Sequence, residues 1–428
     1  MVVRLANSRL GLPAKAVVRK LRETYYNAEV ISRPVTKTAP LVLDMRESEP
    51  LRVNLLIPEI NFARFYGGYI AKFHLARKLT ERGYRVRIIT VDQCIYDIDT
   101  WKREISAYAG LEDIFDMIEV ACCFDRSQKL PVSPSDRVIA TTWWTAYIAR
   151  DFVERLGIAE FVYLVQEYEP FTFPMGSYYA LANASYEFPH KAMFSTQLLQ
   201  QYFINNRVGY LYQSGQVDEN AGHYFENAII RYDANPVTVP TEHKRRLLFY
   251  ARPEAHAARN MFEIGFMALS RAIESGAFDH HEFEFHGIGT SHGDIPLPRG
   301  HTLKMLGKFG LREYKSRLLD YDLGLALMYT PHPSLLPLEM AAAGMLVVTN
   351  ECMNKTADSM QAISTNLLTA RPTIDGVVSK LTEAAANVDN LDLRTSGSRV
   401  RWAPDWETAL DEPRMNLFDQ WLDIPGSN

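Results

Sequence analysis

An early stretch of the sequence, residues 52–92, constrains the fold more than any other part of the chain. It reads RVNLLIPEINFARFYGGYIAKFHLARKLTERGYRVRIITVD, with an apolar run at Val53–Ile57, a loop that holds Gly67 and Gly68, a helix-period segment and a second apolar run at 86–91. The spacing predicts strand, loop, helix and strand, which is the βαβ unit of a parallel sheet. The helix is expected to begin at the glycines, where free backbone N–H groups suit an anionic or hydroxyl-rich ligand.

The same alternation continues along the chain and restarts after a polar, proline-bearing segment at 233–246, which indicates an interdomain linker. In the first part, strand candidates with helical sequence near them lie at 118–124, 136–152, 161–166 and 191–203. In the second part, strand candidates lie at 247–251, 283–287, 303–306, 323–328 and 345–349. We expect an α/β protein with two Rossmann-like domains, 51–240 and 241–395, which face one deep cleft. An extension (1–50) and an aromatic-rich tail (396–428) flank them.

Composition narrows the class of partner. The chain of 428 residues is 47% hydrophobic and 23% charged, and its net charge of −5 gives no reason to expect nucleic acid as a partner. Its four cysteines have no CxxC or CxH spacing, the histidines at 280, 281, 286 and 292 match no metal motif, and no DxD motif follows a convincing strand end. We therefore expect a reduced, cytoplasmic protein that needs neither a metal nor a cofactor.

The first forty residues are locally basic, with eight Lys or Arg residues against two Asp or Glu residues. Apolar positions fall near one face of a possible helix, with basic residues around it. This pattern is typical of a helix that holds a protein against the inner, anionic face of a membrane. A solvated helix that packs on its own domain fits the same pattern. No run approaches 18 apolar residues, so no membrane span is expected.

Three basic residues follow strands of the second domain. Arg252 and Arg259 lie in ARPEAHAARN after one strand, and Lys308 lies in GKFG after another. A third strand leads into a helix that is expected to start near Ser334. Because the carboxyl ends of parallel strands share one edge of the sheet, these groups should converge. Cations beside a helix N-terminus are what a diphosphate needs, although each cation alone also fits an ordinary surface charge.

Glu339 is a lone carboxylate in HPSLLPLEMAAAGMLVVTN, a segment that otherwise indicates a buried core. On the expected helix, Leu336, Met340 and Ala343 form a core-facing stripe, which leaves Glu339 on the opposite face. One turn above a diphosphate, its carboxylate can accept two hydrogen bonds from the hydroxyls of a sugar. The alternative is a carboxylate that accepts from the N–H groups of a neighbouring loop.

Two more carboxylates, Glu167 and Glu169, follow a strand of the first domain in QEYEPF. An extended chain would place both on one side, and paired carboxylates suit acid–base catalysis. Holding hydroxyls of a second substrate, or bracing the loop, are the alternatives.

Several of these segments together resemble one family. PLEMAAAGMLVV is similar to the second half of the nucleotide-binding signature of GT-B glycosyltransferases of the retaining family 4 type. LARKLTERGYRVRIITVD, QEYEPFTFPMGSYYALANASY and LLFYARPEAHAARNMFEIGFMAL look closest to the WsaF-like rhamnosyltransferases, and the resemblance covers roughly residues 50–395. It implies the GT-B fold, with a tail that crosses back to the first domain. The chain departs from the pattern at Pro331, where the family keeps a glutamate eight positions before Glu339.

The resemblance implies roles on the donor side of the cleft. Glu339 would bind a hydroxyl of the ribose or deoxyribose of the nucleotide. Arg252 and Lys308 would bind the diphosphate, with help from the backbone N–H groups of Ser334 and Leu335.

Two further donor-side roles involve departures from the family pattern. Arg259 loosely matches the usual lysine position of the family. His332 or a main-chain group would replace the glutamate that is missing at Pro331.

Acceptor-side candidates lie at the strand ends of the first domain: Tyr66, Gly67, Gly68, Thr142 and Trp143. Each of them also fits ordinary loop structure.

The resemblance implies transfer of a sugar, L-rhamnose from dTDP-L-rhamnose, to a polysaccharide, glycan or lipid-linked saccharide acceptor. The leaving diphosphate would help to deprotonate the acceptor, with retention of configuration and without a metal. A UDP- or GDP-hexose transferase of the same fold, a catalytically silent sugar- or partner-binding protein and a nucleotide-sugar epimerase are the competing interpretations.

Overall fold

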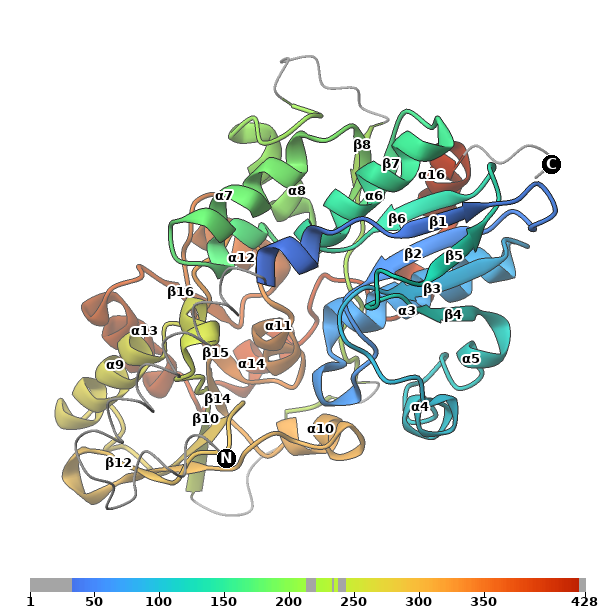
Figure 1. The fold of residues 1–428 in the computed structure, drawn as a ribbon. Helices are drawn as coiled ribbons and strands as arrows, with labels where there is room; N and C mark the ends of the chain where they lie inside the picture. The colour runs from blue at the N-terminus through green and yellow to red at the C-terminus, as the bar shows by residue number, and fades with distance from the viewer. Residues whose placement is uncertain (1–32, 213–220, 233–234, 238–243, 423–428) are drawn as a thin grey trace, which may run out of the picture.

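A computed structural model describes residues 33–212, 221–232, 235–237 and 244–422 of the protein. The basic segment 1–32, with its expected membrane contact, lies outside the described residues. Two helix-covered parallel sheets form two domains that lie side by side (Figure 1).

The first domain is built on a parallel sheet in the order β4-β3-β2-β6-β7-β8-β9. Its strands are β2 (Val53–Ile57), β3 (Val86–Thr90), β4 (Glu119–Cys122), β6 (Arg137–Ala140), β7 (Phe161–Val165), β8 (His190–Phe194) and β9 (Gly222–Tyr224). Its helices are α3 (Gly67–Glu81), α4 (Ile98–Ile105), α5 (Ile114–Met117), α6 (Trp143–Leu156), α7 (Ser177–Ala184) and α8 (Gln197–Asn205), with 3-10 helices η1 (Phe62–Arg64), η2 (Glu169–Thr172) and η3 (Ser185–Glu187). The winding direction changes between β2 and β6, which is the position where parallel sheets bind ligands.

The predicted βαβ unit is confirmed. β2 and β3 pair in parallel from Val53 opposite Val86, and α3 begins at Gly67, the first of the two glycines. Every residue of both strands is buried, because helices cover both faces of the sheet.

The second domain repeats the architecture with the order β12-β13-β11-β10-β14-β15-β16, in which only the pairing of β12 with β13 is antiparallel. Its strands are β10 (Lys244–Tyr250), β11 (Glu282–Ile288), β12 (Ile295–Pro296), β13 (Thr302–Met305), β14 (Leu323–Leu325), β15 (Leu346–Asn350) and β16 (Leu367–Ala370). Its helices are α9 (Phe262–Glu274), α10 (Leu311–Leu318), α11 (Leu335–Ala342), α12 (Ala357–Ile363), α13 (Ile374–Ala386) and α14 (Leu391–Gly397), with η4 (Ala255–Asn260) and η5 (Pro298–Gly300). The fold class predicted from the sequence is therefore confirmed.

Some elements differ from the sequence prediction. β10 begins at Lys244, inside the segment that was expected to be a linker, because its charged residues pair with those of the neighbouring strand: Lys244 contacts Glu282 and Arg246 contacts Glu284 on β11. The short strands β9, β12 and β16 were not predicted, nor was the parallel pair of β1 (Val42–Met45) and β5 (Lys129–Val132).

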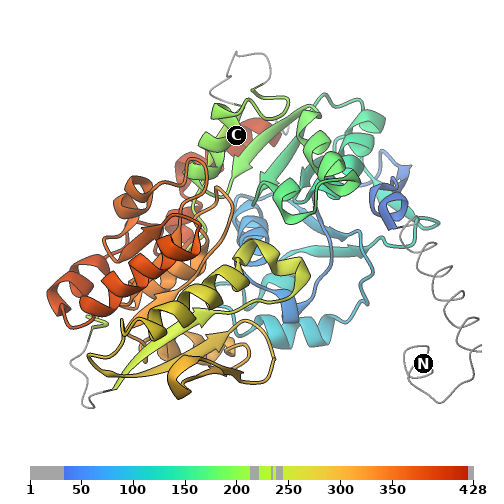
Figure 2. The same ribbon diagram turned by 90° about the vertical axis from the view of Figure 1, so that its left-hand side faces the viewer.

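The tail returns to the first domain. Helices α15 (Trp406–Ala409) and α16 (Glu412–Leu422) follow the second domain in sequence, yet Met415, Phe418 and Leu422 lie in the same hydrophobic core as β2, α3 and β3. Both views show the red end of the chain against the first domain (Figures 1 and 2). Polar contacts support this docking, since Asp419 accepts a hydrogen bond from Tyr84 Oη at 2.7 Å and pairs with Arg82 at 3.0 Å.

Two segments cross between the domains and bind each other. The Trp402 indole N–H donates to the Asn227 carbonyl at 2.8 Å, and the Ile229 N–H donates to the Ala403 carbonyl at 3.1 Å. Both bonds join the chain that leaves the first domain to the chain that returns to it. The relative position of the domains is therefore coupled to this paired crossing.

We expect Phe418→Ala to destabilise the first domain by about 3–5 kcal/mol, because the side chain is fully buried in that core and its removal leaves a cavity. Urea unfolding measures the loss. Gln420→Ala, on the exposed side of the same helix, is the matched control and should change stability little. Equal stability of the two variants would contradict a structural role for the docked tail.

Candidate functional site

The two domains approach each other at the glycines of the first βαβ unit. A Cβ atom on Gly67 would lie 2.7 Å from Leu335 Cδ1 at the start of α11, so a larger residue at this position would require the Leu335 side chain to move. Beside this contact, the Lys308 ammonium lies 5.4 Å from the ring centre of Tyr66, and both side chains are exposed. The structure therefore brings an acceptor-side group and a donor-side group of the sequence prediction together.

Glu167 points from the end of β7 toward the second domain. Burial raises the pKa of its carboxyl group, whereas Arg259, the Tyr168 N–H, Lys355 and the Thr330 hydroxyl lower it. Three of these four groups belong to the second domain. Among the described residues, Glu167 forms no ion pair with an N···O distance of 4.0 Å or less. A carboxylate and two cations thus face each other across the domain boundary without direct pairing.

Lys355 is a residue that the sequence analysis missed. It closes a tight turn in which Cys352 and Lys355 exchange two backbone hydrogen bonds of 3.0 and 2.9 Å. Its side chain is fully buried, its ammonium donates to the Met328 carbonyl at 2.6 Å, and burial lowers its pKa to about 8. At the tip of the same turn, Asn354 donates to the Leu198 carbonyl of the first domain at 2.7 Å. A lysine shortly after a predicted strand was the available signal in the sequence.

The turn before α11 is organised around His332. Its Nδ1 accepts the backbone N–H of Ser334 at 2.9 Å, and burial together with Lys355 and Arg259 lowers the pKa of His332 to about 3. His332 is therefore neutral at physiological pH. The Ser334 N–H was expected to face a diphosphate, but in this structure it donates to His332. Helix α11 begins at the next residue, Leu335.

The two arginines of ARPEAHAARN differ in their surroundings. Arg252 is engaged within its own loop, where it pairs with Glu254 at 3.0 Å and donates to Tyr250 Oη at 3.1 Å. Arg259 keeps a buried Nε for which the described residues provide no hydrogen-bond partner. The structure therefore presents Arg259, rather than Arg252, as the arginine with unused donor capacity.

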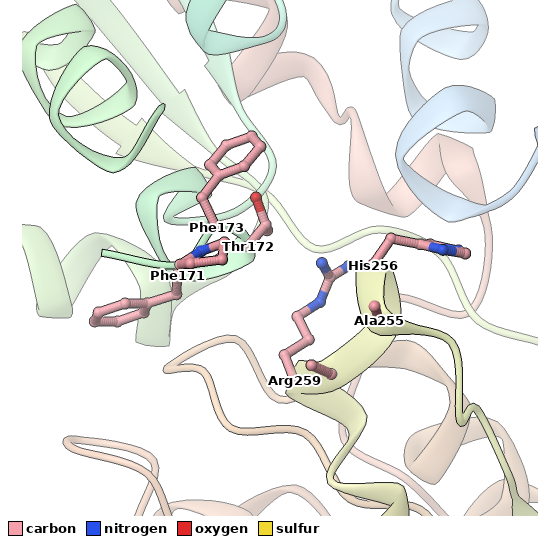
Figure 3. Close-up of a pocket in the computed structure, with 8 residues that line it drawn as sticks. Phe171, Thr172, Phe173, Ala255, His256 and Arg259 are labelled. Atoms are coloured by element: carbon pink, nitrogen blue, oxygen red, sulfur yellow. The ribbon is translucent and has the colours of Figure 1, made fainter. Parts of the chain in front are cut away.

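Arg259 borders a cavity of about 230 Å³ between the domains, lined by Phe171, Thr172, Phe173, Pro174, Ala255, His256, Ala258 and Arg259. The Arg259 side chain extends from η4 toward the segment of the first domain that carries Thr172 (Figure 3). Aromatic and apolar groups come from the first domain and basic groups come from the second. This combination suits a polar ligand with an apolar face, such as a sugar.

Glu339 lies on the polar side of α11, as expected. Its Oε2 accepts the Tyr314 hydroxyl of α10 at 2.7 Å, and the backbone N–H of Ile230 also faces it. Burial raises the pKa of the carboxyl group to about 7, although Tyr314 and Ile230 lower it. The carboxylate therefore contacts a neighbouring side chain and a loop N–H group, whereas its binding of a sugar hydroxyl stays a prediction.

Glu169 lies in a different environment from Glu167. It belongs to η2, so the chain is not extended here and the two carboxylates acquire different partners. Glu169 Oε2 accepts the Trp143 N–H at the start of α6 at 3.0 Å, and the buried Lys72 faces it. The charge of Glu167 is among the causes that raise the pKa of Glu169, and joint action of the two carboxylates in catalysis stays a prediction.

Of the remaining candidates, Thr142 caps α6 through a reciprocal bond with Thr145, and Trp143 is buried. Gly68 lies against the Gln166 side chain, which in turn accepts a hydrogen bond from Asn227 at 3.0 Å. In this structure these residues cap α6, lie in the core or pack against neighbouring side chains.

Two possible features do not occur among the described residues. No group of three or more His, Cys, Asp or Glu side chains in that part of the chain is placed to hold a metal ion. Nor does that part contain a helix with the length and hydropathy needed to cross a membrane.

The fold has known relatives among solved structures. HepE from Anabaena, solved with UDP and glucose, aligns with a TM-score of 0.55 at 12% identity over 89% of this chain and 100% of that chain. Sucrose-phosphate synthase from Thermosynechococcus elongatus aligns with a TM-score of 0.56 at 11% identity over 87% and 99%. WaaG, a glycosyltransferase involved in lipopolysaccharide biosynthesis, aligns with a TM-score of 0.52 at 15% identity over 87% of this chain and 100% of that chain. The architecture is therefore the GT-B fold.

Sequence matches identify the family within this fold class. The WsaF N-terminal domain matches residues 52–197 and the WsaF C-terminal domain matches residues 245–382. Together they cover more than half of the chain, which belongs to the WsaF family. The O-antigen biosynthesis protein RfbC of Myxococcus xanthus is 30% identical over 296 residues, 66% of this chain and 21% of that protein. The chain thus spans about a fifth of the length of this curated relative.

The stability of the protein should depend on pH through Glu169. Burial raises the pKa of this carboxyl group from 4.5 to about 7, so the folded state binds its proton more tightly than the unfolded state does. The group therefore costs stability progressively as the pH rises from about 4.5 to about 7. We therefore expect the free energy of unfolding of Glu169→Gln, measured relative to that of the wild type, to increase by about 1–2 kcal/mol as the pH is raised from 5 to 8.

Urea titrations at the two pH values measure this difference. Glu154→Gln, at an exposed position of α6, is the control and should show no such trend. If the free energies of unfolding of Glu169→Gln and wild type differed by the same amount at both pH values, the raised pKa of Glu169 would be contradicted.

Proposed function

We propose that this protein is a glycosyltransferase that moves a sugar from a nucleotide diphosphate donor to a glycan acceptor of a surface polysaccharide. The observation that carries the proposal is the apposition of Arg259 and Lys355 of the second domain with Glu167 of the first domain, without direct pairing. A diphosphate develops negative charge as it leaves the sugar. Preorganised cations in a desolvated site stabilise such charge.

The donor would lie along the second domain. Glu339 would bind a hydroxyl of the ribose or deoxyribose of the donor nucleotide. Lys308, Arg259 and Lys355 would face the diphosphate. These side chains supply the positive charge that other enzymes take from a metal ion, so we propose a metal-independent reaction. EDTA should leave turnover unchanged.

The acceptor would approach from the first domain. The cavity between η2 and η4 has the size of a single sugar ring, and its Phe173 and Thr172 come from the first domain. In a retaining reaction, an oxygen of the leaving diphosphate would take the proton of the acceptor hydroxyl on the same face. Positioning and charge stabilisation would then provide most of the rate enhancement.

L-rhamnose from dTDP-L-rhamnose is our proposed donor. Membership in the WsaF family and the similarity to an O-antigen biosynthesis protein support a role in polysaccharide synthesis. A lipid-linked acceptor and a cytoplasmic site at the inner face of a membrane belong to the same proposal. A UDP-hexose donor is the main competitor, since the structurally similar HepE was solved with UDP-glucose.

Calorimetry with dTDP, UDP and GDP tests the donor, and release of free nucleotide from the matching nucleotide sugar tests turnover. Tight binding of dTDP alone would support the rhamnosyl proposal, and preference for UDP or GDP would overturn it in favour of a hexosyl donor. Absence of binding and turnover with all donors would indicate a catalytically silent protein. Conversion of the donor sugar to its epimer would identify an epimerase.

We expect Lys355→Met to lower donor turnover about 100-fold, because it removes one buried cation that faces the leaving group. The thermal midpoint should fall, because the Met328 carbonyl loses its buried donor and Glu167 loses a compensating cation, so turnover is compared at a temperature where the variant is fully folded. Lys304→Met, an exposed residue on β13, is the matched control and should retain turnover. Full activity of Lys355→Met would exclude Lys355 from the site.

A further inference from the structure

The carboxylate of Glu339 already has a hydroxyl partner. Tyr314 Oη donates to Glu339 Oε2 at 2.7 Å, which is the distance and chemistry expected of a sugar hydroxyl bound at that oxygen. Both side chains are partly buried. Among the described residues, Tyr314 is the only side chain that donates a hydrogen bond to Glu339, and the backbone N–H of Ile230 faces the same carboxylate.

A second tyrosine forms a hydrogen bond with α10, the helix that carries Tyr314. Tyr232, in the segment that leaves the first domain, donates to the Lys315 carbonyl at 2.8 Å. The ring of Tyr314 also packs against the core cluster that contains Leu338 and Met340 of α11. Tyr314 is therefore held in place by packing as well as by its hydrogen bond.

This arrangement limits what Glu339 can bind. A ribose presents two neighbouring hydroxyls, and an unobstructed carboxylate can accept one on each of its oxygens. Tyr314 Oη engages Oε2, and the backbone N–H of Ile230 also faces the carboxylate, so its remaining capacity to accept hydrogen bonds from a ligand is reduced. A 2′-deoxyribose offers a single ring hydroxyl, the 3′-hydroxyl, and matches that capacity.

We propose that Tyr314 is a specificity-determining residue, which fills one of the two hydroxyl positions at Glu339 and so favours a 2′-deoxynucleoside diphosphate over its ribonucleotide counterpart. This inference rests on the proposed function, because it requires Glu339 to bind the sugar of the donor nucleotide. A ribonucleotide either leaves its 2′-hydroxyl without a partner or must displace a packed tyrosine. Leaving a buried hydroxyl unpaired carries a free-energy penalty.

Matched nucleotide pairs that differ only in the 2′-hydroxyl test the proposal by calorimetry. The pairs are dTDP with 5-methyluridine 5′-diphosphate, dUDP with UDP, and dGDP with GDP. For the base that the wild-type protein binds, we expect the Kd of the ribonucleotide to exceed that of the deoxynucleotide about 10-fold. In Tyr314→Phe, which keeps the ring and frees Oε2, this ratio should fall to about one or below, since a carboxylate oxygen becomes available.

Tyr232→Phe is the matched control. It removes the other tyrosine hydroxyl bond that holds α10, but leaves the bond from Tyr314 to Glu339 intact. It should keep the wild-type ratio even if both affinities change. A loss of discrimination in both variants would attribute the effect to a loosened helix and overturn the proposal.

The remaining outcomes separate this inference from the proposed function. Equal binding of both members of a pair by the wild-type protein, or an unchanged ratio in Tyr314→Phe, overturns the role of Tyr314 and leaves the glycosyltransferase proposal standing. Absence of binding by every nucleotide overturns both.

Discussion

Glu167 of the first domain faces Arg259 and Lys355 of the second domain, and the rest of the site depends on this electrostatic interaction across the domain boundary. The buried ammonium of Lys355 has a lowered pKa and the buried carboxyl of Glu167 has a raised pKa, so each is an unfavourable charge in its own surroundings. Their opposite signs compensate when the domains meet. A ligand that brings two or more negative charges into this region would alter that compensation and could thereby influence how closely the domains approach.

Several polar groups of the site hold one another in the structure. Tyr314 takes one oxygen of Glu339, and His332 takes the N–H of Ser334. Buried polar groups that lacked partners would cost stability, so such internal bonds stabilise the fold around the site. Ligand binding at either place is then an exchange of hydrogen bonds. Selectivity arises from which ligand atoms can reproduce the bonds that are given up.

The sequence predicted the fold well because strands buried on both faces leave continuous apolar runs, as in Val53–Ile57, and glycines mark the helix start that follows. It also placed Glu339 on the polar face of its helix. It could not reveal that Arg252 pairs within its own loop, or that Glu169 begins a 3-10 helix and accepts the Trp143 N–H, since both depend on local side-chain and backbone geometry. Lys355 was missed because its burial results from a turn that no periodic pattern indicates.

The docked tail has a consequence for biosynthesis. Phe418 and Leu422 complete a hydrophobic core whose other members come largely from the first domain, including β2, α3 and β3 near the start of the described chain. During translation, the first domain emerges from the ribosome long before α16 is made. Its apolar surface stays uncovered while the whole second domain is synthesised, which is the period when an incomplete domain is most exposed to aggregation and chaperone binding. Helix α16 thus ties maturation of the first domain to synthesis of the second.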